Sequence, residues 1–231
     1  EAGHWPERWR LDWVLPLYKK KSVYDPKNYR GIHLSAQFSK VVERLVARSF
    51  LLYLERKGVA GLNQFAYRRK RGCKDALAFN VLQWVYWLHL GKKVGLYCSD
   101  VSGAFDKVSS ERLLKKLENF GAGRKLLTFL RSWLAYRLAV VVVNGAFSSQ
   151  TRLMNMVYQG TVLGPPLWNC FFGDVSSVVL ETGFLEILLA DDLNCYKDYE
   201  DTAAQEEVDS ELKQCQAAVH RWGKPGRVRL Y

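Results

Sequence analysis

The stretch FLEILLADDLNCYK, from Phe184 to Lys197, places two adjacent aspartates between an apolar run and a second, partly apolar run. Two short runs of this kind around a polar pair are typical of a β-hairpin. Successive side chains on a strand point to opposite faces, so Asp191 and Asp192 cannot both be buried against one apolar layer. Paired aspartates at a turn are often only turn residues, because aspartate tolerates the conformations of tight turns. Any further role depends on the residues around them.

A third aspartate provides that context. Asp100 ends the apolar run KVGLYCSD, which predicts a strand followed by a helix that begins near Ser109 or Ser110. An aspartate at the carboxyl end of a strand can face the same crevice as a carboxylate on a neighbouring hairpin tip. Carboxylates held together repel one another strongly unless a divalent cation lies between them. The sequence therefore predicts a metal site formed by Asp100 and Asp191.

The metal that suits such a site is Mg²⁺, with Mn²⁺ as its substitute. Mg²⁺ prefers oxygen ligands, takes few protein carboxylates and completes its shell with water and substrate phosphates. Two such ions about 3.5–4 Å apart stabilise both the attacking and the leaving oxygen of an in-line phosphoryl transfer. We therefore expect two metal ions and chemistry at a phosphate.

The composition indicates a nucleic-acid partner. The chain has 231 residues, is 48% hydrophobic and carries a formal net charge of +11. This charge is typical of polyanion binding, although a well-solvated basic protein has the same feature. The five cysteines form no close pair, which predicts reduced thiols and an intracellular protein. No apolar run is long enough to cross a bilayer, so no membrane partner is expected.

Apolar periodicity predicts five helices and a further hairpin. The helices are expected over residues 38–57, 74–90, 123–136, 167–181 and 206–222, and the hairpin turns at Asn144-Gly145. In the first two of these helices the apolar residues form a stripe along one face. These stripes are Phe38, Val41, Val42, Leu45, Val46, Phe50 and Leu52 in the first helix, and Leu77, Val81, Trp84 and Leu88 in the second.

Three motifs occur in a characteristic order: SDVSGAFDKV, then YQGTVLGPPLWN, then LLADDL. This series resembles motifs A, B and C of the reverse transcriptases of the non-LTR (LINE-like) retrotransposon class. Upstream, LPLYKKKSVYDPKNYRGIHLSAQFSKVVERLV resembles the fingers segment of those enzymes, and NQFAYRRKRGCKDAL is similar to their Gln-x-Gly-Phe-Arg segment. The resemblance covers nearly the whole chain.

The resemblance implies an α+β fold: a right-hand polymerase palm with an antiparallel sheet and helices, plus a basic fingers subdomain. The sheet carries Asp100 and the Asp191 hairpin, with helices on its far face. Residues 1–92 correspond to the fingers, and residues 93–231 to the palm with motifs A, B, C and the start of D. The thumb, and the lysine usual in motif D, would lie beyond Tyr231. We therefore expect this chain by itself to polymerise poorly or not at all.

The resemblance also implies an RNA-directed DNA polymerase, which uses two metal ions to join dNTPs to a primer 3′-hydroxyl. Asp100 and Asp191 would ligate both metals, and Val101 would contribute a backbone carbonyl. Asp192, on the opposite face, would be a secondary ligand or a structural support. The implied partners are an RNA template, a DNA primer and dNTPs, and the implied location of an active element is the nucleus.

Other residues match nucleotide-binding positions of the class. Phe105 falls where a bulky residue lies beneath the incoming sugar and excludes a 2′-hydroxyl; its alternative role is that of a core aromatic. Gln159 and Gly160 match the start of motif B, where a glycine lets the backbone approach the nucleotide. Arg68 would grip the triphosphate, since a fork of donors suits phosphate oxygens. Arg30 matches a further basic position of the fingers.

Two other functions remain open at this stage. An RNA-dependent RNA polymerase shares the palm, but Ala190 in place of glycine before the aspartates, and Phe105, argue against it. The second is a degenerate fragment that serves as a basic RNA-binding or ribonucleoprotein subunit. This alternative is based on Leu189, which stands where the class usually has tyrosine or phenylalanine. Two further departures are Tyr158 for a common proline and Ala66 for a common glycine.

Overall fold

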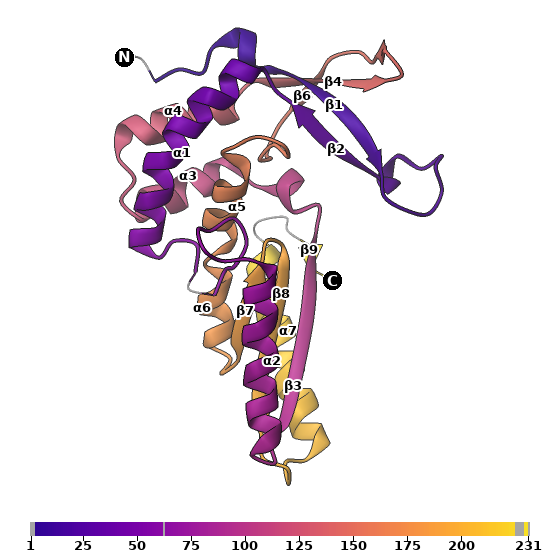
Figure 1. The fold of residues 1–231 in the computed structure, drawn as a ribbon, viewed down its shortest axis with the longest axis vertical. Coiled ribbons are helices and arrows are strands. Elements are labelled where there is room, and N and C mark those ends of the chain that lie inside the picture. Colours follow the sequence, from indigo (N-terminus) through magenta and orange to yellow (C-terminus); the bar gives the residue numbers. More distant parts are fainter. Residues whose placement is uncertain (1–2, 62, 225–228, 231) are drawn as a thin grey trace. The chain divides into compact units, whose positions relative to one another are not determined.

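The computed structural model describes residues 3–61, 63–224 and 229–230, and shows two compact units (Figure 1). The first unit comprises Glu1–Lys57 and Phe105–Trp168, and the second comprises Gly58–Ala104 and Asn169–Tyr231. Each unit thus combines two separate stretches of the chain. These boundaries differ from the boundary at residue 92 that the resemblance implies between fingers and palm, and that functional division stays a prediction. Among the described residues, none of the helices is both long and apolar enough to cross a membrane.

The first unit contains a five-stranded sheet in the order β2-β1-β4-β5, with β6 also pairing with β4. β1 runs antiparallel to β2 and parallel to β4. The predicted Asn144-Gly145 turn joins β4 to β5, and both of its residues have positive φ, as a tight hairpin turn requires. The strands are β1 (Leu11–Tyr18), β2 (Tyr29–Leu34), β4 (Arg137–Val143), β5 (Ala146–Phe147) and β6 (Thr151–Leu153).

Among the described residues, the helices α1 (Gln37–Lys57), α3 (Ser110–Asn119) and α4 (Arg124–Leu134) lie wholly within this unit. The side chain of Ser109, one of the two serines near which this helix was expected to begin, caps α3 by accepting a hydrogen bond from the amide of Arg112. Three 3-10 turns complete the local structure: η1 (Glu7–Trp9), η2 (Pro26–Asn28) and η3 (Ala104–Lys107).

The second unit contains an antiparallel sheet in the order β7-β8-β3-β9. Its strands are β3 (Lys93–Ser102), β7 (Leu185–Leu189), β8 (Asp192–Tyr199) and β9 (Arg229–Leu230). The helix α2 (Cys73–His89) packs on one face, and α7 (Gln205–Gly223) packs on the other (Figure 1). On the α2 face, Ala76 and Trp87 form a core cluster with Ile187 and Tyr196. The expected helix on the face far from the aspartates is α7, and α2 covers the face of the aspartates in addition.

The helix expected over residues 167–181 is two helices, α5 (Gly164–Phe172) and α6 (Val175–Leu180). Gly173 lies between them and packs so closely against the carbonyl of Val59 that an added Cβ would collide with it. The backbone at Gly173 thus approaches the backbone of Val59 more closely than a residue with a side chain would allow. The position of this break depends on a contact with a residue far away in the sequence.

The positions of the other predicted helices are confirmed, and the buried faces of α1 and α2 differ for the most part from their apolar stripes, of which Phe50 in α1 is buried. In α1, Phe38 is 79% exposed and Leu45 is 61% exposed, whereas the buried residues are Ser39, Glu43, Ala47, Phe50 and Leu54. In α2 the buried residues are Ala76, Asn80 and Trp87. Both buried faces include polar residues, and a pattern of apolar residues cannot predict the burial of polar ones. In α7 the buried residues include Val208, Cys215 and Val219.

Candidate active site

The sheet of the second unit brings two aspartates together. Asp100 on β3 is the direct partner of Asp192 on β8 in the strand register. Residues opposite one another in an antiparallel pair have Cβ atoms about 4.5–5.5 Å apart and point to the same face. Both aspartates line a hollow of about 470 Å³, together with Asn80 of α2 and Asn194 of β8. The prediction that Asp192 lies on the opposite face is therefore wrong.

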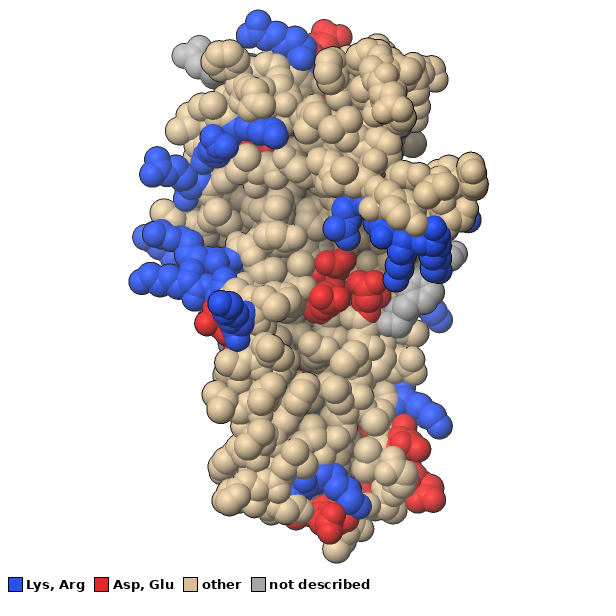
Figure 2. Space-filling view, turned by 45° about the vertical axis from the view of Figure 1, so that its right-hand side comes forward, with Lys and Arg blue, Asp and Glu red and all other residues tan. Residues whose placement is uncertain are grey.

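The cause is the turn that precedes Asp192. Leu189 pairs with Asp192, which leaves Ala190 and Asp191 as a two-residue loop. Ala190 has a φ of +60°, an uncommon conformation for a residue with a side chain. The loop interrupts the alternation of faces that the sequence prediction had assumed. In the space-filling view, one group of acidic side chains lies near the middle of the displayed face, and further acidic side chains lie near its lower end (Figure 2).

The electrostatics of the pair suit a cation. Burial raises the pKa of Asp192, and the negative charge of Asp100 raises it further. Within the part of the chain that the structure describes, His, Cys, Asp and Glu side chains form no group of three or more arranged to hold a metal ion. Two carboxylates on one face nevertheless fit Mg²⁺, because this ion uses one or two carboxylates and fills its shell with water and substrate phosphates. The protein would thus supply only part of the ligands of the ion, and the substrate phosphates and water would supply the rest.

Replacing Asp100 with asparagine should stabilise the metal-free protein. Like charges directly opposite in a sheet are destabilising, so we expect the melting temperature at pH 7 in EDTA to rise by about 1–3 °C. The cost comes from ionised Asp192, whose pKa is raised in the folded state. The destabilisation by this repulsion has its full size at pH values above the raised pKa of Asp192, and it vanishes below the ordinary aspartate pKa of about 3.9. The gain should therefore disappear in melts at pH 3–4.

The matched control is Glu118→Gln, which removes an exposed carboxylate from its ion pair with Lys115. Such surface pairs contribute little, so its melting temperature should stay within about 1 °C of the parent. A titration of the Asp192 carboxyl by NMR should also show a lower pKa in Asp100→Asn. A lower melting temperature for Asp100→Asn at neutral pH would contradict the repulsion.

In the first unit, Phe105 is firmly held. Its side chain is only 7% exposed and stacks on Trp168, with ring centroids 5.8 Å apart and an angle of 18° between the planes. Its carbonyl accepts a hydrogen bond of 2.8 Å from the amide of Val157. Phe105 is therefore a packed aromatic at the turn after β3, and its contact with a sugar stays a prediction.

The motif B loop is fastened to β2. The carbonyl of Gln159 accepts a hydrogen bond of 2.9 Å from the amide of His33. Gly160 has a φ of +96°, and an added Cβ would lie 2.7 Å from the carbonyl oxygen of His33. The close approach that requires glycine here is thus an approach to the β2 backbone, whereas the sequence interpretation had assigned it to a nucleotide.

Glu43 fixes the other side of this loop, and sequence reasoning gave it no role. It is buried, and its Oε2 accepts hydrogen bonds from the amides of Val162 and Leu163, at 2.7 and 3.1 Å. Burial raises the pKa of this carboxyl, and the two backbone hydrogen bonds oppose the rise. Glu43 lies four residues after Ser39 and four before Ala47, so the three residues share one helix face. This spacing was the signal in the sequence that could have indicated burial of Glu43.

A second buried network includes His33 on β2, the residue whose amide binds the carbonyl of Gln159. Asp12 accepts a hydrogen bond of 3.1 Å from Arg137 and lies 3.3 Å from Nδ1 of His33, and the three side chains are buried. The guanidinium of Arg137 also lies over the rings of Trp5, Trp133 and Tyr158, at 5.3, 5.2 and 4.6 Å from their centroids. Local sequence pattern carries no sign of this network, because its members are far apart along the chain.

The structure places the remaining predicted residues as follows. Val101 is buried on β3, where it pairs with Leu230. Arg68 is half-buried and donates a 2.8 Å hydrogen bond to the carbonyl of Gly61. Arg30 is exposed on β2. Asp100, Val101, Asp191, Asp192 and Arg68 belong to the second unit, and Phe105, Gln159, Gly160 and Arg30 belong to the first.

An antiparallel sheet with paired aspartates beside its hairpin loop, packed between helices, defines the palm of a polymerase. Solved structures with this fold include apo telomerase from Candida tropicalis, truncated of its C-terminal domain. That chain is 11% identical with a TM-score of 0.63, and the match covers 96% of this chain and 50% of the other. Telomerase from Candida albicans in complex with a fragment of telomeric RNA gives a TM-score of 0.57 at 13% identity, over 92% and 40%. The predicted α+β polymerase fold is confirmed.

The sequence profile of the family described as reverse transcriptase (RNA-dependent DNA polymerase) matches residues 18–228, so the chain belongs to the reverse transcriptase family. Similar proteins include the RNA-directed DNA polymerase from the mobile element jockey of Drosophila melanogaster, 27% identical over 100% of this chain and 25% of that protein. The probable RNA-directed DNA polymerase from transposon X-element of Drosophila melanogaster is 28% identical over 74% and 19%. The chain thus spans a fifth to a quarter of the length of these relatives. The predicted resemblance to the non-LTR class is confirmed.

Proposed function

We propose that this chain is the polymerase domain of an RNA-directed DNA polymerase of a non-LTR retrotransposon. The observation that carries the proposal is the register pair of Asp100 and Asp192 beside the Asp191 loop, in a chain of the reverse transcriptase family. The substrates are an RNA template, a DNA primer and dNTPs. The relatives named as RNA-directed DNA polymerases support this assignment. We propose the nucleus as the site of action.

In the proposed reaction, the primer 3′-oxygen forms a bond to the α-phosphorus of a dNTP, and the bond to the departing pyrophosphate breaks. Two Mg²⁺ ions, when bound, supply positive charge for the attacking and leaving oxygens. Asp100 and Asp191 would hold them, with the backbone carbonyl of Val101, and Asp192 would add a further carboxylate on the face of Asp100. The side chains of this chain thus act mainly by binding and orienting the reactants.

The test of the proposal is incorporation of a single dNTP with the chain in molar excess over a DNA primer annealed to an RNA template. This format detects turnover as slow as one event in hours, which suits a chain expected to polymerise poorly. Extension that requires Mg²⁺ or Mn²⁺ supports the proposal. Absence of extension with either metal overturns polymerase activity for this chain by itself.

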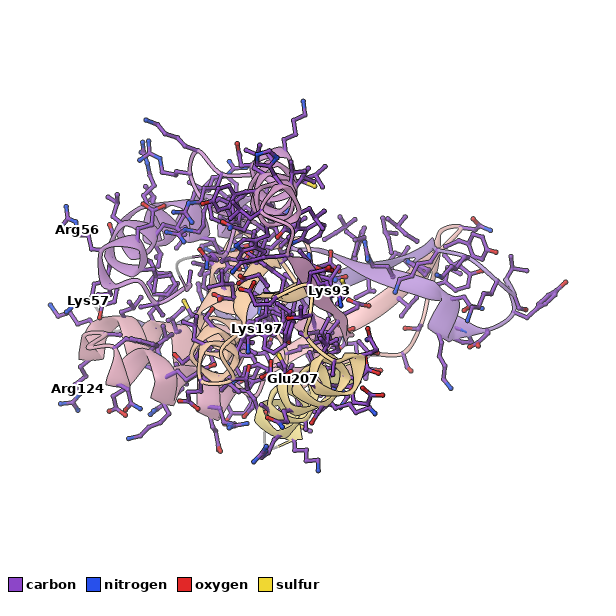
Figure 3. All side chains as sticks on the ribbon, turned by 90° about the horizontal axis from the view of Figure 1, so that it is seen from below. Arg56, Lys57, Lys93, Arg124, Lys197 and Glu207 are labelled. Carbon is purple, nitrogen blue, oxygen red and sulfur yellow. The ribbon has the colours of Figure 1, made fainter. Side chains whose placement is uncertain are left out.

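Nucleic-acid binding should be strongly dependent on salt. Lys19 to Lys21 and Arg68 to Arg71 supply charge without obvious base-reading groups. Arg56, Lys57 and Arg124 also point outward from the ribbon of the first unit (Figure 3). Each phosphate contact releases counterions, so a primer–template bound through about six phosphates should lose about 10³-fold in affinity between 50 and 200 mM salt. Fluorescence anisotropy with two unrelated sequences would measure this, and equal affinities at both salt concentrations would contradict it.

Phe105 should exclude ribonucleotides if its ring meets the sugar of the incoming nucleotide. In Phe105→Ala the discrimination between dNTP and rNTP, compared as incorporation rate over half-saturating concentration, should fall by about tenfold or more. The control is Trp168→Phe, which keeps an aromatic partner for position 105 and should leave discrimination unchanged. Because Phe105 is packed on Trp168, melting curves must show that the alanine variant is folded. Unchanged discrimination in a folded, active variant would make Phe105 a core aromatic only.

The second candidate function is that of a basic RNA-binding or ribonucleoprotein subunit without catalysis. The observation that favours it is Leu189, which replaces the usual aromatic and is partly buried against the cluster around Phe65 and Tyr196. The two functions differ in one measurement. A chain that binds RNA with steep salt dependence but extends no primer with Mg²⁺ or Mn²⁺ is the subunit.

A further inference from the structure

The segment from Asn63 to Ala66 lies along the edge of β7 and forms hydrogen bonds to β7 and to the loop that carries Asp191. Leu188 donates its amide to the carbonyl of Asn63 at 3.0 Å, and Phe65 donates to the carbonyl of Leu188 at 2.9 Å. Gln64 and Leu188 thereby form a parallel bridge outside the regular strands. The segment, β7 and the loop all belong to the second unit.

Gln64 is completely buried, and its side-chain amide acts on the backbone of Ala190. Its Oε1 accepts a hydrogen bond of 3.0 Å from the amide of Ala190 and another of 2.9 Å from the amide of Ala66. Its Nε2 donates to the carbonyl of Ala190 at 3.3 Å. The side chain thus binds both polar backbone groups of one residue, as a paired backbone segment would do.

Ala190 is a residue that needs such support. It has a φ of +60°, and this left-handed conformation is unfavourable for a residue with a Cβ. Strained conformations persist where the surrounding structure holds them, and they concentrate at functional sites. The residue that follows is Asp191, so the backbone angles of Ala190 set the direction in which the aspartate leaves the loop.

We propose that Gln64 is a positioning residue for the catalytic carboxylates: its amide holds Ala190 in the left-handed conformation and so fixes the orientation of Asp191. The inference rests on the proposed polymerase function. A primary amide suits the role because it offers a donor and an acceptor side by side. Methionine has a similar length but offers neither strong group, and glutamate places an oxygen where the Ala190 carbonyl requires a donor.

A purely structural role for Gln64 makes a different prediction, which the chain itself allows to be tested. Asn169 anchors the same segment, because its Nδ2 donates a 2.9 Å hydrogen bond to the carbonyl of Ala66. It is buried like Gln64. Asn169→Leu therefore removes a buried hydrogen bond from the segment at a residue away from the Ala190 contacts, and it is the matched control.

The experiment compares Gln64→Met, Gln64→Glu and Asn169→Leu in the 231-residue chain. Mn²⁺ affinity is measured by electron paramagnetic resonance, and amide hydrogen exchange is followed in residues 188–192. Single-turnover incorporation separates the rate at saturating dNTP from the half-saturating dNTP concentration. Outer partners of metal ligands contribute about 10–100-fold to affinity or activity, so both Gln64 variants should lose about that factor in Mn²⁺ affinity and in saturated rate.

In the same Gln64 variants the half-saturating dNTP concentration should change by less than about threefold, because Gln64 is completely buried and its side chain binds the backbone of Ala66 and Ala190. Exchange at Ala190 should become faster. Asn169→Leu should keep its Mn²⁺ affinity and its rate within about twofold of the parent. If Gln64→Met fails to fold, as shown by its melting curve, Gln64→Glu decides the outcome.

Two results would overturn the inference: Gln64 variants with the Mn²⁺ affinity and rate of the parent, or an Asn169→Leu variant that loses as much as they do. The second result would assign the effect to packing of the segment. Failure of the proposed function is distinguishable, because in that case the parent chain itself incorporates nothing and binds no Mn²⁺.

Discussion

Replacing Asp191 with asparagine should reduce dNTP incorporation by about 10³-fold or more. A bound metal provides several kcal/mol of charge stabilisation in the transition state, and each 1.36 kcal/mol is a tenfold change in rate. An asparagine keeps the size of the side chain but removes the charge that would hold the ion. Single-turnover extension of a DNA primer on an RNA template, with Mg²⁺, measures the loss.

The matched control for this experiment is Asp198→Asn. Asp198 lies on β8, where it forms an ion pair with Lys92 at 2.7 Å. Because the strand alternates its faces, Asp198 and Asp192 share one face of the sheet, six residues apart. Asp198→Asn should keep its incorporation rate within about threefold of the parent, since half-exposed ion pairs such as this one contribute little. A rate in Asp191→Asn within about tenfold of the parent would exclude Asp191 as a metal ligand.

Replacing Asp12 with alanine should lower the free energy of unfolding by about 3–5 kcal/mol, because the change leaves a buried guanidinium without its counter-ion. Arg137 and Asp12 are both completely buried, and His33 depends on the same carboxylate. Urea unfolding followed by tryptophan fluorescence is a direct measurement. The rings of Trp5 and Trp133 contact the guanidinium and therefore report on the network.

Two further variants serve as controls for the Asp12→Ala measurement. Glu211→Gln breaks the half-exposed pair of Lys197 and Glu211 and should cost about 1 kcal/mol or less. The double variant Asp12→Leu with Arg137→Met removes both buried charges and should recover most of the stability that Asp12→Ala loses. An Asp12→Ala variant as stable as Glu211→Gln would show that the buried pair does not support the unit.

The sequence by itself determined the family, the α+β class and most of the element positions. The reason is that these features depend on local chemistry. The Asn144-Gly145 turn, the cap at Ser109 and the apolar strands on either side of Ala190 and Asp191 each favour one backbone conformation over a few residues. The order of the three motifs then indicated the class, because such a series of short segments is specific even where each segment alone is weak.

The tertiary structure alone decided which aspartates face one another and which helix faces are buried. Asp192 pairs with Asp100 because the loop of Ala190 and Asp191 shifts the alternation of faces, and Gln64 contacts that loop from a distant part of the chain. Glu43 is buried because amides more than a hundred residues away need an acceptor. Hydrogen bonds between distant residues leave no periodic pattern in a sequence, whereas apolar stripes do. The structure therefore supplied the polar contacts that orient the site.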